Sequence, residues 1–137
     1  MNYSKHELAN VNHVAAVVKD LESSIKVLVE GFGLRVGPIS EIKELGIRVS
    51  FVEGENILIE LIQPFASGPY IEFLEKGQLG FNHMAIEVDD LPSNIRKLEK
   101  LGIKTSGTPF AGAKGEVQNL DPSTTSDLRL QLIQLRH

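Results

Sequence analysis

The stretch NHVAAVVKDLESSI, from Asn12 to Ile25, recurs later in the chain as NHMAIEVDDLPSNI, from Asn82 to Ile95. At this shift of 70 residues, nine of the seventeen positions between Asn12 and Leu28 are identical. The identical positions include one histidine in each copy, His13 and His83. This self-similarity indicates that the chain contains a duplicated module.

The size and composition are those of an ordinary globular protein. The chain has 137 residues, of which 42% are apolar and 23% are charged, so it is long enough for one domain with a buried core. We therefore expect a single domain over residues 1–137. Within it we expect a first module at about 11–64, a connector at 65–80 and a second module at about 81–137.

The charge and hydropathy of the chain exclude several classes of partner. A net charge of −4 leaves no basic surface for nucleic acid. No apolar run approaches the roughly 20 residues of a membrane-spanning helix, and the N-terminus lacks the apolar segment of a signal peptide, so we expect a cytoplasmic protein. There is no cysteine, so any bound metal must have nitrogen and oxygen ligands.

The first module is expected to contain a strand, a helix and further strands. Residues 11–18 are mostly apolar on both faces of a strand, which predicts that both faces are covered. Asp20 is placed to cap a helix that Gly33 ends. The predicted apolar face of this helix consists of Leu21, Ile25, Leu28 and Phe32.

The remaining strands of this module follow from β-forming runs and turn residues. We expect strands at 46–52 and 57–62, joined by a hairpin turn at EGEN, and one more strand within 36–44. The connector should contain a short helix over 70–76, which Gly77 closes.

The second module repeats this plan. It begins with a predicted strand at 81–88, and Asp90 caps a helix that Gly102 ends. Later strands are expected at 115–120 and 128–135. The predicted apolar face of the second helix consists of Leu91, Ile95 and Leu98.

The duplication also matches a second pair of polar residues. Glu60 in ELIQ corresponds to Gln131 in QLIQ at a shift of 71. If the two modules pack about a pseudo-twofold axis, these two side chains and the two histidines converge on one point. A carboxylate on a strand of Ile and Leu is costly to bury unless it is paired or binds a metal. Two imidazoles, a carboxylate and an amide oxygen suit Zn, Fe, Co, Ni or Mn, so we predict a divalent metal site at His13, Glu60, His83 and Gln131.

Each of these residues also has a purely structural explanation. A lone histidine on a strand is more often a hydrogen-bonded core residue than a ligand. Duplication alone would copy all four residues, so a relic site that no longer binds metal stays open as an alternative.

The repeated plan, with a histidine on each first strand and an acid or amide on each last strand, resembles the vicinal oxygen chelate superfamily of glyoxalases, bleomycin-resistance proteins and dioxygenases. The order of VNHVAAVVKDLESSI, ELIQP, SGPYIEFLEKGQLGFNHMAIEVDDL and LQLIQ is most similar to the methylmalonyl-CoA epimerase family. The resemblance implies an α+β fold in which two tandem βαβββ modules form a cupped mixed sheet with helices outside. It also implies the same four metal ligands and a homodimer.

The chain departs from the family at two places. The family usually has a glutamate where this chain has Gln131, and an amide cannot take a proton. The strand GIRVSFV, where epimerases can carry a catalytic carboxylate, offers Arg48 and Ser50 instead.

The resemblance implies a metal-dependent epimerase, isomerase or glyoxalase-type lyase that acts on a small carbonyl or acyl-CoA substrate through an enolate. Glu60 is then the predicted catalytic residue as well as a ligand, and Glu116 is a weaker candidate for the base. Lys43, Arg48 and Lys114 are candidates for binding an anionic substrate, although scattered basic residues are usually solvated.

Two other functions stay open as alternatives. A non-catalytic protein that binds small molecules, like the bleomycin-resistance proteins, typically lacks metal ligands. A ring-cleaving Fe(II) dioxygenase needs two histidines and a carboxylate, which His13, His83 and Glu60 supply. Those enzymes, however, place the carboxylate on the last strand, where Gln131 lies.

Overall fold

The computed structural model describes residues 8–78 and 80–136 and divides into two compact units. The first unit consists of residues 13–82, and the second consists of residues 1–12 and 83–137. Each unit contains a strand, a helix and three more strands, so the α+β class and the repeated βαβββ plan are confirmed.

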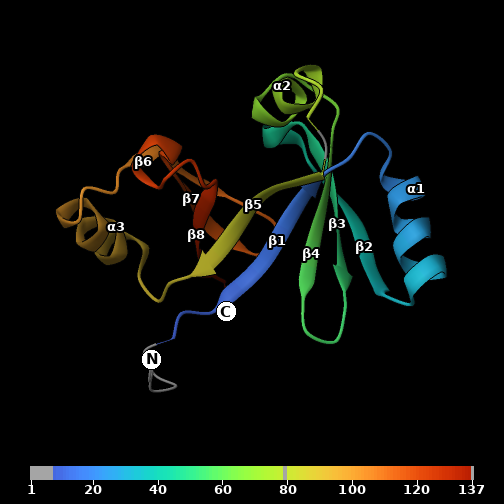
Figure 1. The fold of residues 1–137 in the computed structure, drawn as a ribbon, viewed down its shortest axis with the longest axis horizontal. Coiled ribbons are helices and arrows are strands. Elements are labelled where there is room, and N and C mark those ends of the chain that lie inside the picture. The colour runs from blue at the N-terminus through green and yellow to red at the C-terminus, as the bar shows by residue number, and fades with distance from the viewer. Residues whose placement is uncertain (1–7, 79, 137) are drawn as a thin grey trace. The chain divides into compact units, whose positions relative to one another are not determined.

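The first unit has a mixed four-stranded sheet (Figure 1). Its strand order is β2-β3-β4-β1, in which β1 and β4 are parallel and the other neighbours are antiparallel. The first two residues of β1 belong to the second unit. The elements are β1 (Val11–Val17), α1 (Leu21–Lys26), a π-helical continuation (Val27–Gly31), β2 (Arg35–Ile42), a 3-10 turn (Lys43–Leu45), β3 (Ile47–Glu53), β4 (Leu58–Pro64) and α2 (Pro69–Glu75).

The local signals in this unit act as predicted. The carboxylate of Asp20 accepts a hydrogen bond of 3.1 Å from the backbone N–H of Ser23 and so caps α1. Gly33 has a φ of +74°, which is the left-handed conformation expected after a helix. Between β3 and β4, the N–H of Gly54 donates to the carbonyl of Ile57 at 2.9 Å, which closes the predicted hairpin.

The prediction for Phe32 is wrong. Its side chain is 74% exposed and does not join the apolar face of the helix. The last turn, Val27–Gly31, is π-helical, and its i→i+5 bonds change the phase of the residues that follow. The spacing that would have turned Phe32 toward the sheet is therefore lost.

Both faces of β1 are covered, as its sequence predicts. On one face, Ala16 packs with Leu61 of β4 and Leu21 of α1. On the other, Ala15 and Val17 pack in a cluster that includes Phe73 of α2. Because neighbouring residues of a strand face opposite sides, His13 shares the face of Ala15 and Val17.

The second unit repeats this architecture with the strand order β5-β8-β7-β6. Here β5 and β8 are parallel, and Leu91 of α3 packs in a cluster with Leu120 and Leu132. Asp90 caps α3 through a 3.0 Å hydrogen bond from the N–H of Ser93. The elements are β5 (Gly80–Glu87), α3 (Leu91–Lys100), β6 (Thr105–Ala111), β7 (Gly115–Leu120), a 3-10 turn (Pro122–Thr124) and β8 (Leu130–Leu135).

The strand β6 was not among the strands predicted from β-forming runs in the sequence. Its segment TSGTPFA is largely exposed, contains glycine and proline, and shows no alternation of apolar and polar residues. An edge position in the sheet tolerates such a sequence because proline then removes no hydrogen bond from an inner ladder.

Each unit also contains, at equivalent positions, a side-chain contact that was not predicted. The side-chain oxygen of Gln63 accepts a 2.8 Å hydrogen bond from the N–H of Leu21, and that of Gln134 accepts the same bond from Leu91. In each unit this bond ties the start of the helix to the last strand. The duplication therefore extends to individual contacts, and equivalent positions of the two units can be compared directly.

Among the helices of the described residues, none combines the length and the apolar character that crossing a membrane requires.

Candidate metal centre

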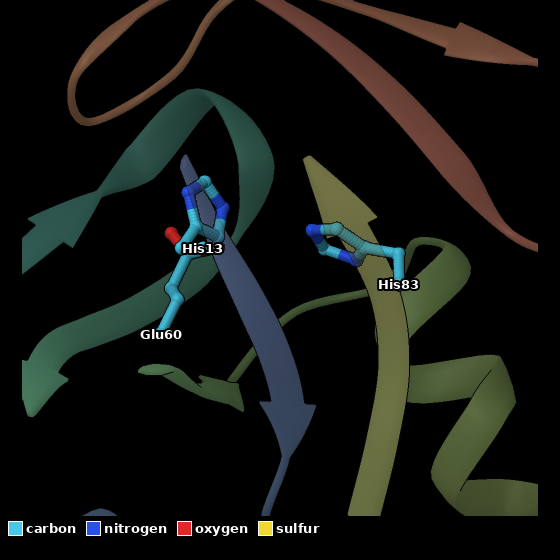
Figure 2. A group of neighbouring side chains, drawn as sticks. All are labelled: His13, Glu60 and His83. Atoms are coloured by element: carbon cyan, nitrogen blue, oxygen red, sulfur yellow. Dashed lines mark ion pairs between the residues drawn. The ribbon is translucent and has the colours of Figure 1, made fainter. Parts of the chain in front are cut away.

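In the first unit, β1 and β4 bring His13 and Glu60 together. The strands are parallel, and Ala15 lies opposite Glu60 in their register. The Nε2 atom of His13 lies 3.4 Å from Oε1 of Glu60, and the two residues are only 4% and 8% exposed. Figure 2 shows the two side chains directed toward one another. A nitrogen donor and an oxygen donor thus meet inside the protein.

Phe51 is a neighbour of this pair that was not among the residues predicted for the site. It lies opposite Glu60 in the antiparallel register of β3 and β4, so both residues are on one face of the sheet. Its ring is perpendicular to the His13 imidazole, with 5.5 Å between the ring centroids and 86° between the planes. The alternation of residues in GIRVSFV indicates that Val49 and Phe51 share one face of the strand. Only the register between β3 and β4 shows that this is the face of Glu60.

Arg48 and Ser50 stand on the strand where epimerases can carry a catalytic carboxylate. These residues lie opposite Gln63 and Leu61, so they are on the other face of the sheet from Glu60. The guanidinium of Arg48 forms a 2.8 Å ion pair with Glu22, which raises its pKa.

The hydroxyl of Ser50 is buried on that same face. It donates to the carbonyl of Gly37 at 3.1 Å, beside the irregularity of β2 between Val36 and Ile39. Neither Arg48 nor Ser50 therefore takes the place of a carboxylate near Glu60.

In the second unit, β5 and β8 carry His83 and Gln131 in the same arrangement. Ala85 lies opposite Gln131, just as Ala15 lies opposite Glu60. Both residues are buried, with 8% of His83 and 6% of Gln131 exposed. Figure 2 also draws His83, on β5. Each unit therefore presents one histidine and one acid or amide on one face of a parallel strand pair.

The remaining sequence candidates lie away from these faces or are exposed. Glu116 is exposed and lies opposite Gln134, on the other face of the second sheet from Gln131. This position removes Glu116 as a candidate base beside Gln131. Lys43 is exposed in a 3-10 turn, and Lys114 is half-buried just before β7.

The chemistry of these side chains fits a divalent metal ion. Among the described residues, His13, Glu60 and His83 are buried side chains of the types that bind metals. Neutral imidazole with carboxylate oxygen suits the divalent metals from Mn to Zn. A cation beside a buried carboxylate also offsets the free-energy cost of removing that carboxylate from water.

Comparison with known proteins places the chain in a family. A family model described as the Glyoxalase/Bleomycin resistance protein/Dioxygenase superfamily matches residues 12–117. The chain belongs to this superfamily, which confirms the resemblance seen in the sequence.

Within that superfamily, the relatives are methylmalonyl-CoA epimerases. The mitochondrial methylmalonyl-CoA epimerase of Mus musculus is 34% identical over 113 residues, covering 80% of this chain and 64% of that protein. An ethylmalonyl-CoA/methylmalonyl-CoA epimerase of Cereibacter sphaeroides is also 34% identical over 113 residues, covering 80% of this chain and 84% of that one.

Solved structures agree with the fold. The methylmalonyl-CoA epimerase of Mycobacterium tuberculosis has a TM-score of 0.85 at 23% identity, covering 93% of this chain and 88% of that one. A hypothetical protein of Bacillus halodurans C-125 has a TM-score of 0.90 at 20% identity, covering 96% and 97% of the two chains.

Proposed function

We propose that this protein is a metal-dependent epimerase of acyl-CoA thioesters of the methylmalonyl-CoA type. The observation that carries the proposal is the same arrangement in each unit: a histidine two residues before an alanine that lies opposite a buried acid or amide. The names of the relatives supply the substrate class. A homodimer and a cytoplasmic location stay predictions.

In this proposal, His13, Glu60, His83 and Gln131 hold the metal. The ion would be Zn, Co, Ni, Mn or Fe, because these accept mixed imidazole and oxygen ligands. When bound, it supplies Lewis-acid polarisation of the thioester carbonyl, which makes the hydrogen on the adjacent carbon more acidic. Ala15 and Ala85, both fully buried, are the small residues that follow the histidines on the same faces.

Glu60 is assigned to remove the proton from the carbon next to the thioester. Among the residues that the structure describes, it is the only buried carboxylate. Val49 and Phe51, which share the face of Glu60 on β3, have no ionisable group, and the amide of Gln131 cannot accept a proton. Glu60 takes the proton as a general base and leaves a planar enolate. A proton from solvent water, added to the opposite face, inverts the configuration, and the protonated Glu60 then releases its proton to the hydroxide left in the solvent.

The experiment that tests the proposal follows the exchange of this hydrogen. Metal-loaded protein and methylmalonyl-CoA are mixed in D2O, and deuterium on the α-carbon is measured by mass spectrometry. Exchange should exceed that of a protein-free control and should fall at least 100-fold in Glu60→Gln, since the amide cannot take the proton. Glu53→Gln, the same change at an exposed carboxylate on β3, should exchange like the wild type. Substrate that binds without exchange would instead indicate a non-catalytic binding protein.

A further inference from the structure

We infer that Asn119 is a positioning residue that holds the carboxamide of Gln131 with its oxygen, and not its nitrogen, available to the metal. The inference rests on the proposed function, in which Gln131 is a metal ligand. It concerns one face of the second unit, where β7 and β8 run side by side.

The residue is found by comparing equivalent positions of the two units. In the first, Phe51 lies opposite Glu60, and Val49 lies opposite Ile62. In the second, Asn119 lies opposite Gln131, and Val117 lies opposite Ile133. Asn119 is therefore the counterpart of Phe51, and an aromatic side chain in one unit corresponds to a carboxamide in the other.

The difference between Phe51 and Asn119 matches the difference between Glu60 and Gln131. A carboxylate has two equivalent oxygens, so Glu60 presents a donor atom to a metal whichever way its end group is rotated. A carboxamide has one oxygen acceptor and one NH2 group, and a half-turn exchanges them. Gln131 therefore needs a partner that selects one orientation, whereas Glu60 does not, and Phe51 serves as an apolar neighbour of His13.

Asn119 is placed to be that partner. Side chains directly opposite in an antiparallel pair have Cβ atoms about 4.5–5.5 Å apart, within reach of two amide side chains. Three other neighbours of Gln131 on this face, Ala85, Val117 and Ile133, are apolar and form a buried cluster. His83, two residues before Ala85 on β5, is a polar residue of the same face. If Oδ1 of Asn119 accepts a hydrogen bond from Nε2 of Gln131, Oε1 of Gln131 is left facing the ion.

The backbone at Asn119 is held firmly enough for this role. Its carbonyl oxygen accepts a 2.8 Å hydrogen bond from the side-chain NH2 of Gln118, a residue that is only 1% exposed. The side chain of Asn119 points to the opposite face from Gln118 and is half-buried. Partners of this kind, which orient a ligand without touching the metal, typically change metal affinity by about 10- to 100-fold.

A double-mutant cycle tests the inference, with Co²⁺ as the metal and no substrate present. Affinity is measured by competition against a chromogenic chelator. Coordination is followed in the visible d–d spectrum. Asn119→Leu should weaken Co²⁺ binding about tenfold when residue 131 is glutamine. In a Gln131→Glu background the same change should alter affinity less than about twofold, because either carboxylate oxygen can bind. Asn119→Asp keeps the acceptor oxygens and should bind at least as tightly as the wild type.

Three outcomes would each overturn the inference. Asn119→Leu could lower Co²⁺ affinity equally in the two backgrounds, or in neither. Asn119→Asp could lower Co²⁺ affinity as much as Asn119→Leu. If Asn119→Leu does not fold, Asn119→Ser, which is too short to reach Gln131, takes its place with the same expectations. A wild-type protein that binds no Co²⁺ would overturn the proposed metal site and the inference together. Co²⁺ binding that is indifferent to residue 119 would overturn the inference alone.

Discussion

The ring of Phe51 lies perpendicular to the imidazole of His13, with 5.5 Å between the two centroids. Perpendicular aromatic pairs of this kind are worth roughly 0.5–1.5 kcal/mol beyond the area they bury. The contact restricts the rotation of the imidazole and keeps Nε2 toward Glu60, which lies 3.4 Å away.

Replacing Phe51 should therefore weaken metal binding without abolishing it. Phe51→Leu keeps an apolar side chain but loses the ring contact, so we expect a fall of about 3- to 10-fold in metal affinity. Titration with Co²⁺ measures this change. Val36→Ala, at a partly exposed apolar side chain of the edge strand β2, is a control that should leave the affinity unchanged.

Removal of His83 tests the metal site most directly. His83→Ala should copurify with far less metal per chain than the wild type, because a four-ligand site loses one of its two imidazoles. Elemental analysis of the two proteins measures this, and circular dichroism confirms that the variant is folded. Equal metal content would contradict the proposed site.

Arg48 should not take part in binding the substrate, because its guanidinium is already paired with Glu22 on the opposite face of the sheet from Glu60. Arg48→Gln should change KM for methylmalonyl-CoA less than about twofold. The pair is partly exposed and screened by solvent, so its loss should change stability little. A tenfold rise in KM at unchanged stability would show that the arginine reaches the substrate after all.

Gln118 should matter for stability and not directly for chemistry. Its NH2 group donates to the carbonyls of Ser106, Gly107 and Asn119, next to the irregularity in the pairing of β6 with β7. Gln118→Leu leaves these carbonyls without that donor and should lower the free energy of unfolding by about 2 kcal/mol.

Ser50 makes the equivalent bond in the first unit, to Gly37 alone. Ser50→Ala should therefore cost less, about 1 kcal/mol. Urea unfolding of both variants and the wild type makes the comparison. Equal costs would contradict the view that Gln118 serves more than one carbonyl.

The cap at Asp90 should make stability depend on pH. Hydrogen bonds from the side chain and the backbone of Ser93 hold the pKa of Asp90 below its ordinary value. A carboxyl group whose pKa is lower in the folded state stabilises the protein above its unfolded pKa, and this contribution is lost as the pH falls through the folded pKa. The stabilisation should therefore be complete at pH 5 and above and decline below about pH 4.

Thermal unfolding of Asp90→Ala measures this contribution. The variant should melt about 3 °C below the wild type between pH 5 and pH 8, and the difference should shrink as the pH falls below about 4. Asp90→Asn retains a capping side chain, so its melting temperature at neutral pH should stay close to that of the wild type. A difference that grows toward acid pH would have the wrong sign for this mechanism.

Local signals in the sequence predicted most of the secondary structure. Capping aspartates, glycines after helices and runs of β-forming residues act over a few residues, so Asp20, Asp90 and the hairpin near Gly54 were found without tertiary information. The strand β6 was missed because its edge position, and not its composition, keeps it in the sheet.

The sequence by itself determined the duplication, the βαβββ plan and the residue types of the candidate metal site, because repeated residues and short-range periodicity are visible in one dimension. Only the tertiary structure decided which face each strand residue occupies. A shift of one residue in register moves every side chain of a strand to the other face. The register depends on the pairing of segments that are separate in the sequence, so it is seen only in the folded structure. The register turned Arg48 and Ser50 away from Glu60, placed Phe51 beside it, and set Asn119 opposite Gln131.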